Sequence, residues 1–455
     1  MTVYSSGAQP SFVCRLLAEL AGGENTVQPL FGPALTDSFE AGAYLAAWND
    51  ENAAAQLGVH DSFRDVCERK AYTLGKVQRR QIEKLYGKQL QLSASQIDRQ
   101  AECRLSYFLK YGMRAKERKE ATVDPAEFGT YVHAVLEQTA REVLELGGFP
   151  SVSLDQTMEI AMKYSAAYAA EHFSQLDSER MTYLFRRNGQ ELRFVVRELW
   201  EELQQSQFQP ADFEVNFGNT GGLPPIPVNG KTMNAILRGF VDRVDTWEHH
   251  GNDYYRVVDY KTGRKDFDYC DVFNGVGLQL LLYLFALQEC GTDVVGQRPI
   301  PAGVQYFPAR APYMTTDGRM NPEELEKQRL KDLKRQGLLL QDEEILQAME
   351  PGEHPKRLCY TVKSDGSLSG DLADREQLKL LKAYLQRLLG HMVDEIASGD
   401  VEANPYTRGT SHSACTYCPY GAVCHQAEVE GRRNYKTMTA QRFWDEIGKE
   451  MDTNG

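Results

Sequence analysis

Two short stretches of the sequence combine residue types that can support metal-assisted chemistry. The first stretch, LRGFVDRVD, contains Asp242, and the second, VVDYKTG, contains Asp259 and Lys261. Successive side chains of a β-strand point to opposite faces, so we expect Asp259 and Lys261 to point the same way. A carboxylate that binds a hard cation would then lie beside an amine that can orient or deprotonate water, which is the minimum equipment for metal-assisted phosphodiester hydrolysis. An isolated Asp-x-Lys triplet is nevertheless more often an exposed ion pair at a strand end.

Two adjacent strands are needed to bring these three side chains together. Apolar alternation predicts strands over residues 233–247 and 254–261, which would form a β-hairpin with one carboxylate on each strand. Apolar residues at helical spacing predict the neighbouring helices. The other expected elements are helices over 128–146, 154–175, 277–289 and 374–398 and strands over 212–217 and 302–307.

Further polar residues occupy the elements next to the hairpin. His133 lies on the upstream helix four residues before Glu137, so the two share a face. Gln279 and Tyr283 are also four residues apart, on the leucine-rich helix that follows the hairpin. Each pair has a plain structural explanation, either as a satisfied histidine or as part of a buried apolar helix. Glu214, on the strand before the hairpin, is an additional carboxylate that could reach a metal.

The order of these elements is more specific than any one of them. A helix with a histidine, a strand with an aspartate, a strand with Asp-x-Lys and a helix with Gln-x₃-Tyr follow one another along the chain. This succession resembles the RecB-type branch of the PD-(D/E)XK nuclease superfamily. The resemblance implies a restriction-endonuclease-like α/β fold, in which helices flank a mixed central sheet. It also implies that Gln279 and Tyr283 contact the substrate backbone or brace the site.

The same resemblance assigns roles to the residues on and near the hairpin. His133, Asp242 and Asp259 are expected to ligate Mg²⁺ or Mn²⁺. Lys261 is expected to position the attacking water and to steady the charge on the scissile phosphate. These roles are what the resemblance implies, because the spacing alone establishes only that the groups can share a site.

Four of the nine cysteines form a second pattern. Cys415, Cys418 and Cys424 follow the spacing C-x₂-C-x₅-C, and three thiols need a fourth ligand. The adjacent His425 would complete a Cys₃His zinc site on spacing alone. The distant Cys103 is the alternative, because one cysteine before a nuclease core and three after it resemble the iron–sulfur nuclease domain of AddB, a component of AddAB helicase–nucleases. That resemblance implies a [4Fe–4S] cluster held by four thiolates.

An iron–sulfur staple would join the two ends of the nuclease domain. Closing so long a loop restricts the unfolded chain, so we expect a structural rather than a redox role. Zinc bound by these thiols, or four thiols without a common ligand, are the alternatives. The resemblance to AddB covers roughly residues 88–430 and includes the segments LSAS and FLKYG on either side of Cys103, together with PAGVQYF and GLLL further on.

Composition sets outer limits on the function. The chain has 455 residues, of which 42% are hydrophobic and 25% charged, as in a folded protein with an ample core. No apolar run approaches the roughly 18 residues that span a bilayer, and the N-terminus does not resemble a signal peptide, so we expect a cytoplasmic location. The net charge of −13 argues weakly against an independent DNA binder, although a local basic groove can still hold DNA.

Three domains are expected along the chain. Residues 1–88 would be the helical remnant of a helicase-like region, residues 89–430 the nuclease domain and residues 431–455 a helical tail. The segment Gly230-Lys231-Thr232 lacks the upstream glycine of a P-loop because position 225 is proline, so we expect no ATP hydrolysis by this chain.

The resemblance implies a Mg²⁺-dependent DNA exonuclease module. Its substrate would be a single strand delivered from an unwound duplex end by an AddA-type helicase–nuclease partner, during double-strand-break repair by homologous recombination. Two alternatives remain open at this point. One is a stand-alone iron–sulfur nuclease that trims DNA ends, and the other is a nuclease-fold scaffold that binds DNA or a partner without cutting.

Overall fold

The computed structural model places the chain in two units, Met1–Leu74 and Gly75–Gly455. In the first unit, helices α3 (Glu51–Gln56) and α4 (His60–Lys70) bury Ala54 and Phe63 in a small core of their own. Most of the predicted segment 1–88 lies outside the described residues. The structure describes residues 45–46, 51–70, 76–116, 125–172, 179–218, 222–312, 321–409, 412–424 and 431–452.

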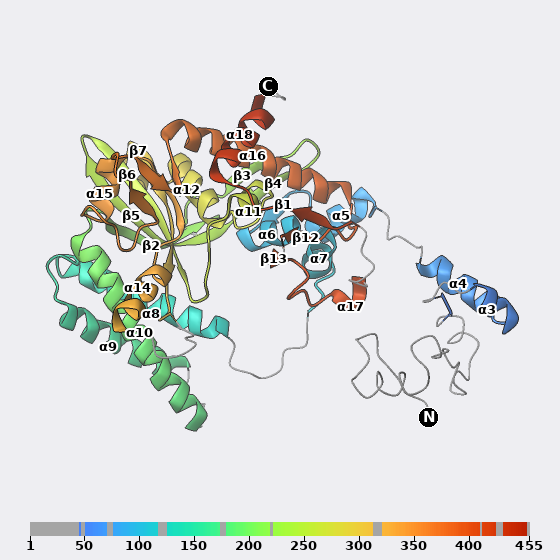
Figure 1. Ribbon diagram of the computed structural model, residues 1–455, viewed down its shortest axis with the longest axis horizontal. Helices are drawn as coiled ribbons and strands as arrows, with labels where there is room; N and C mark the ends of the chain where they lie inside the picture. Colours follow the sequence, from blue (N-terminus) through green and yellow to red (C-terminus); the bar gives the residue numbers. More distant parts are fainter. Residues whose placement is uncertain are drawn as a thin grey trace. The chain divides into compact units, whose positions relative to one another are not determined.

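A six-stranded mixed sheet forms the centre of the second unit (Figure 1), with the strand order β11-β8-β7-β6-β5-β2. Strand β5 pairs antiparallel with both β2 and β6, and β7 runs parallel to β6. The β-hairpin predicted from the sequence is confirmed as β5 and β6. The strands are β2 (Gln209–Phe217), β5 (Gly239–His249), β6 (Asn252–Lys261), β7 (Pro299–Pro308), β8 (Gly337–Leu340) and β11 (Leu372–Ala373).

Helices cover both faces of this sheet. On one face, α8 (Pro125–Glu145), α9 (Leu154–His172) and α10 (Glu179–Gln205) share a core with Val258 of β6. On the other face, Val257 belongs to the core that contains the side chains of α12 and α16. Consecutive residues of β6 therefore face opposite cores, as expected for a central strand covered on both sides.

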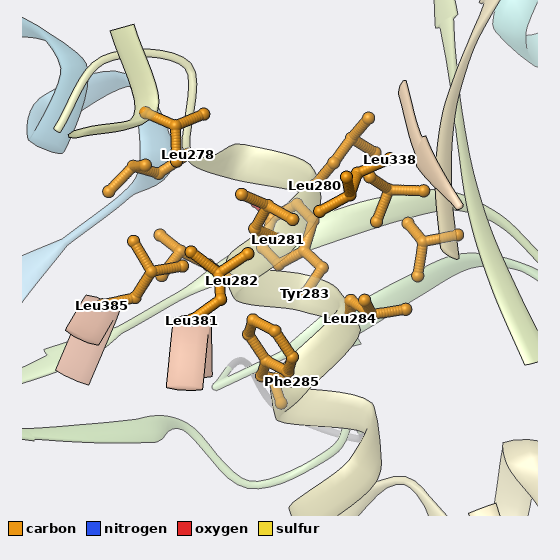
Figure 2. Packing of buried hydrophobic residues seen from close by; sticks show 14 of the residues in the cluster. Leu278, Leu280, Leu281, Leu282, Tyr283, Leu284, Phe285, Leu338, Leu381 and Leu385 are labelled. Atoms are coloured by element: carbon orange, nitrogen blue, oxygen red, sulfur yellow. The ribbon is translucent and has the colours of Figure 1, made fainter. Parts of the chain in front are cut away.

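The helix α12 (Gln279–Cys290) connects β6 to β7 and is apolar almost throughout. Figure 2 shows its leucines packed toward Leu338 of the sheet and toward Leu381 and Leu385 of α16 (Arg375–Ser398). The start of α16 is well defined, because Asp374 and Gln377 form a reciprocal capping box there. The predicted helices over 128–146, 277–289 and 374–398 are thus confirmed within a few residues.

One predicted strand is wrong. Residues 233–247 form two strands, β4 (Asn234–Leu237) and β5, which belong to different sheets. The chain turns at Arg238, whose backbone N–H donates to the carbonyl of Leu92 in β1. The next residue is a glycine because a Cβ at position 239 would collide with the hydroxyl of Tyr283. A continuous apolar pattern could not reveal this change of sheet.

The remaining elements surround these two sheets. The predicted serine cap before the first cysteine is confirmed, because Ser93 and Gln96 form a capping box at the start of α6. No helix in the described part of the chain is long and apolar enough to cross a membrane. The further elements are α5 (Arg79–Tyr86), β1 (Leu90–Leu92), α6 (Ala94–Glu102), α7 (Arg104–Tyr107), the π-helix η2 (Phe108–Gly112), β3 (Ile226–Asn229), α11 (Tyr269–Phe273), α13 (Thr292–Val295), α14 (Pro322–Asp332), α15 (Glu343–Met349), β9 (Tyr360–Val362), β10 (Leu368–Gly370), β12 (Tyr406–Arg408), β13 (His412–Ser413), α17 (Gly421–Cys424), β14 (Arg433–Tyr435) and α18 (Ala440–Asp452).

Candidate active site and cysteine cavity

The end of the β5–β6 hairpin brings the predicted acidic residues together. Asp259 is only 2% exposed, and its Oδ2 contacts the Nζ of Lys261. The two side chains therefore point the same way, as the strand spacing predicts. Burial, followed by repulsion from the Asp242 carboxylate, raises the pKa of Asp259 to about 6.

His133 reaches the same place from helix α8. Its Nδ1 lies 3.5 Å from Oδ2 of Asp242, and its Nε2 lies 3.0 Å from the backbone carbonyl oxygen of Tyr260. The N–H of Tyr260 donates to Asp242 across 2.8 Å, so one residue of β6 touches both side chains through its backbone. With Nε2 donating to the carbonyl, the lone pair of Nδ1 faces Asp242 and is free to ligate a cation.

Glu214 of β2 is a closer member of the site than the sequence suggested. Its φ of 49° lies in the left-handed region, which is uncommon for a residue other than glycine. One ligand atom each of His133, Glu214 and Asp242 lies within 4.8 Å of the other two. Burial, and then the Asp242 carboxylate, raises the pKa of Glu214 to about 7. Strained backbone that aims a carboxylate at other carboxylates is a frequent property of functional sites.

The donor set fits a hard divalent cation. Glu214, Asp242 and Asp259 supply carboxylate oxygens, which Mg²⁺ and Mn²⁺ prefer, and His133 supplies one nitrogen. The raised carboxyl pKa values reflect mutual repulsion as well as burial, and a bound cation would relieve that repulsion. Of the three ligands predicted from the sequence, His133 and Asp242 lie in the tightest group with Glu214, and Asp259 lies beside them against Lys261.

Tyr283 and Gln279 of α12 occupy different environments. Tyr283 is 3% exposed, its hydroxyl accepts a hydrogen bond from the Phe240 N–H, and its ring stacks on Phe217. These contacts fit the bracing role, because the hydroxyl supports the start of β5. The side chain of Gln279 is half-buried and has no hydrogen-bond partner within the described residues, so its amide is available to a substrate.

A buried cluster of charges supports the site from within the core. Arg243 donates to the hydroxyl of Tyr260 across 3.2 Å and pairs with Glu202 of α10 across 3.0 Å. Burial alone would raise the pKa of Glu202, but the guanidinium groups of Arg335, Arg256 and Arg243 hold it at about 2. Residues of this cluster are among the most buried of the described part of the chain. No sequence pattern indicated the cluster, because charged residues on strands usually mark exposed faces.

The four cysteines singled out by their spacing meet at one cavity. Cys103 lies between α6 and α7, whereas Cys415, Cys418 and Cys424 follow β13 in the C-terminal part of the domain. All four line the same cavity. Burial, together with the neighbouring thiols, raises the pKa of Cys415 and Cys424.

The spacing of these sulfur atoms fits a cluster better than a single ion. Tetrahedral zinc holds its sulfur ligands about 2.3 Å from the metal, which places them roughly 3.8 Å apart. Within the described residues, no three cysteines bring their sulfur atoms within 4.8 Å of one another. A multi-iron cluster separates its thiolate ligands more widely than one zinc ion does. His425, the other candidate ligand, lies outside the described residues.

The order of the elements, the convergent carboxylates and the four thiols agree with a comparison to known proteins. A family model described as the PD-(D/E)XK nuclease superfamily matches residues 91–425. The chain belongs to the PD-(D/E)XK nuclease superfamily. The matched range begins before Cys103 and ends after Cys424, so it contains every site residue predicted from the sequence. The predicted fold class of a PD-(D/E)XK nuclease, a mixed sheet flanked by helices, is confirmed.

Curated relatives of this PD-(D/E)XK nuclease are named as the B-type component of an ATP-dependent helicase/deoxyribonuclease. The protein from Acetivibrio thermocellus is 32% identical over 94% of this chain and 38% of its own length. The proteins from Clostridium novyi and Moorella thermoacetica are 33% and 35% identical over 81% and 75% of this chain, and over 33% and 30% of their own lengths. The chain thus spans about a third of these relatives, and the predicted resemblance to AddB is confirmed.

Proposed function

We propose that this chain is the nuclease module of an ATP-dependent helicase–nuclease and hydrolyses phosphodiester bonds of DNA with Mg²⁺ or Mn²⁺. The observation that carries the proposal is the convergence of one imidazole, three carboxylates and Lys261 at the end of one hairpin. The names of the curated relatives supply the substrate class.

The side chains divide the work between the cation and the phosphate. His133, Glu214 and Asp242 would hold the ion, with Asp259 as a further carboxylate. When bound, the ion supplies Lewis-acid stabilisation and a more acidic water. Lys261, which is about one-third exposed, brings a fixed positive charge to the phosphate. Its contact with Asp259 holds the ammonium at the site, where it can orient water and offset charge on the scissile group.

The partner and the substrate follow from the relatives rather than from this chain alone. A segment without a P-loop needs a motor to deliver DNA, and an AddA-type partner would supply it. We infer that the substrate is a single strand from an unwound duplex end, cut during double-strand-break repair by homologous recombination. Phosphate contacts should dominate, so binding should be tolerant of sequence and sensitive to salt.

The cysteine cavity is proposed to hold a [4Fe–4S] cluster on Cys103, Cys415, Cys418 and Cys424. Four thiols around one cavity, spaced more widely than zinc requires, support this choice. The cluster would act as a cross-link between the two ends of the domain. Anaerobic purification followed by iron, sulfide and zinc analysis tests it, and zinc without sulfide would exclude the cluster.

Substitution of Asp259 by Asn tests the active site. The change keeps the size of the side chain and removes its charge, so we expect Mg²⁺-dependent cleavage of a labelled single strand to fall by roughly a thousandfold or more, which corresponds to several kcal/mol of transition-state stabilisation. Asp332→Asn, an exposed carboxylate on α14, is the matched control and should cleave normally. Cleavage that survives in Asp259→Asn would rule out the assigned site and leave the non-cutting scaffold as the better interpretation.

A further inference from the structure

The β5–β6 hairpin carries a second group of metal-ligand side chains at its opposite end. His249 and His250 lie at the turn, and Glu344 lies in the first turn of α15. One ligand atom of each of these three residues lies within 4.8 Å of the other two. Asp242 precedes His249 by seven residues in β5, so the two groups are about 23 Å apart along the strand at roughly 3.3 Å per residue. The group is therefore separate from the active site.

The turn places a histidine where turn chemistry favours another residue. His249 pairs with Asn252, so His250 and Gly251 form a two-residue loop. Their φ values are 50° and 72°, and a loop with two positive φ values is a type I′ turn, which favours asparagine or glycine at its first position. A histidine there gives up local preference. It brings the two imidazole rings together, with centroids 3.9 Å apart.

The neighbouring contacts hold the first imidazole in a fixed orientation. Its ring stacks on Trp247 at a centroid distance of 4.2 Å, and its Nε2 lies 2.7 Å from Oε1 of Glu344. Trp247 is itself packed against Phe208 and Tyr254. Orientation of a ligand by such surrounding contacts is typical of metal sites. Glu344 is 62% exposed, so an ion can enter from solvent.

We propose that His249, His250 and Glu344 bind Zn²⁺. Two imidazole nitrogens and one carboxylate oxygen suit zinc, whereas Mg²⁺ and Ca²⁺ prefer oxygen ligands throughout. Three protein ligands leave the fourth position of a tetrahedral ion to water. The ion fastens the tip of the hairpin to α15, and so fixes the strand register at the end opposite the catalytic carboxylates. This site is independent of the proposed nuclease function.

Zinc binding by the full chain, with its cysteine ligand intact, tests the proposal. Titration under anaerobic conditions in excess Mg²⁺ should give one more Zn²⁺ per chain for the wild type than for His250→Asn. The asparagine removes one ligand and supplies the residue that the turn prefers, so the variant should fold. Zn²⁺ should also raise the Tm of the wild type more than that of His250→Asn, whose Tm without zinc should be equal or higher.

Two glutamate variants of α15 complete the experiment. Glu344→Gln should lose the same equivalent of zinc as His250→Asn, whereas Glu343→Gln, which alters the neighbouring residue outside the group, should retain it. The proposal is overturned if the wild type, His250→Asn and Glu344→Gln bind equal numbers of zinc ions. It is also overturned if zinc raises the Tm of all three by the same amount.

Discussion

The active site and the cysteine cavity gather their residues in opposite ways. In the active site, Asp242, Asp259 and Lys261 come from a single hairpin, and the carboxylates are crowded and buried enough to raise the pKa of Asp259 to about 6. In the cavity, Cys103 and Cys415 are 312 residues apart in the sequence. Crowded like charges oppose folding unless a cation neutralises them, whereas a cross-link between distant segments stabilises the fold. The first region is arranged for chemistry and the second holds the domain together.

The largest stability effect should come from the cavity. Replacement of Cys418 by serine removes one proposed ligand of the cross-link, and closing a loop of this length is worth on the order of 5 kcal/mol. We expect loss of iron and a lower free energy of unfolding by several kcal/mol, measured by denaturant titration under anaerobic conditions. Cys290→Ser is the matched control, because its hydroxyl can keep the bond to the Ala286 carbonyl. Equal stability of the two variants would contradict the structural role.

A smaller effect should appear beneath the active site, where the two roles overlap. Glu202→Gln leaves three buried guanidinium groups short of a negative charge, and breaking such a buried pair costs about 3–5 kcal/mol. Because Arg243 also holds the hydroxyl of Tyr260, cleavage should fall together with stability. Glu201→Gln, at the more exposed neighbouring position, should change both only slightly. A Glu202→Gln variant as stable as Glu201→Gln would show that the cluster does not support the sheet.

The pH dependence of stability should distinguish the regions most gently. The carboxyls of Asp259 and Glu214 have pKa values of about 6 and about 7, above their ordinary values near 4. Between about pH 4 and about pH 7 the folded chain therefore binds more protons than the unfolded chain, and the free energy of unfolding contributed by these groups falls as pH rises.

A divalent cation should reverse that loss. The ionised carboxylates bind Mg²⁺, so the cation should raise the Tm more at about pH 7.5 than at about pH 5.5. Asp259→Asn should reduce both the loss with rising pH and the gain with Mg²⁺. An equal Mg²⁺ shift at the two pH values would mean that these carboxyls do not receive the ion.

The sequence predicted the active site better than its surroundings. The order of His133, Asp242, Asp259 and Lys261 along the chain was enough to place these residues together, because alternation on strands and spacing on helices constrain their faces. Glu214 was only a secondary candidate, since its orientation depends on a left-handed backbone that no local pattern indicates. The break at Arg238 was missed because both strands are apolar, and only their partners differ.

The claim that matters most is that side chains from α8, β2 and the hairpin converge on one divalent ion. Mn²⁺ binding, measured by electron paramagnetic resonance on the full chain, tests it directly. We expect the wild type to bind Mn²⁺ that Mg²⁺ can displace, and Asp242→Asn to lose at least one such ion while unfolding at the same temperature as the wild type. Unchanged Mn²⁺ binding in Asp242→Asn would contradict the assignment of the site.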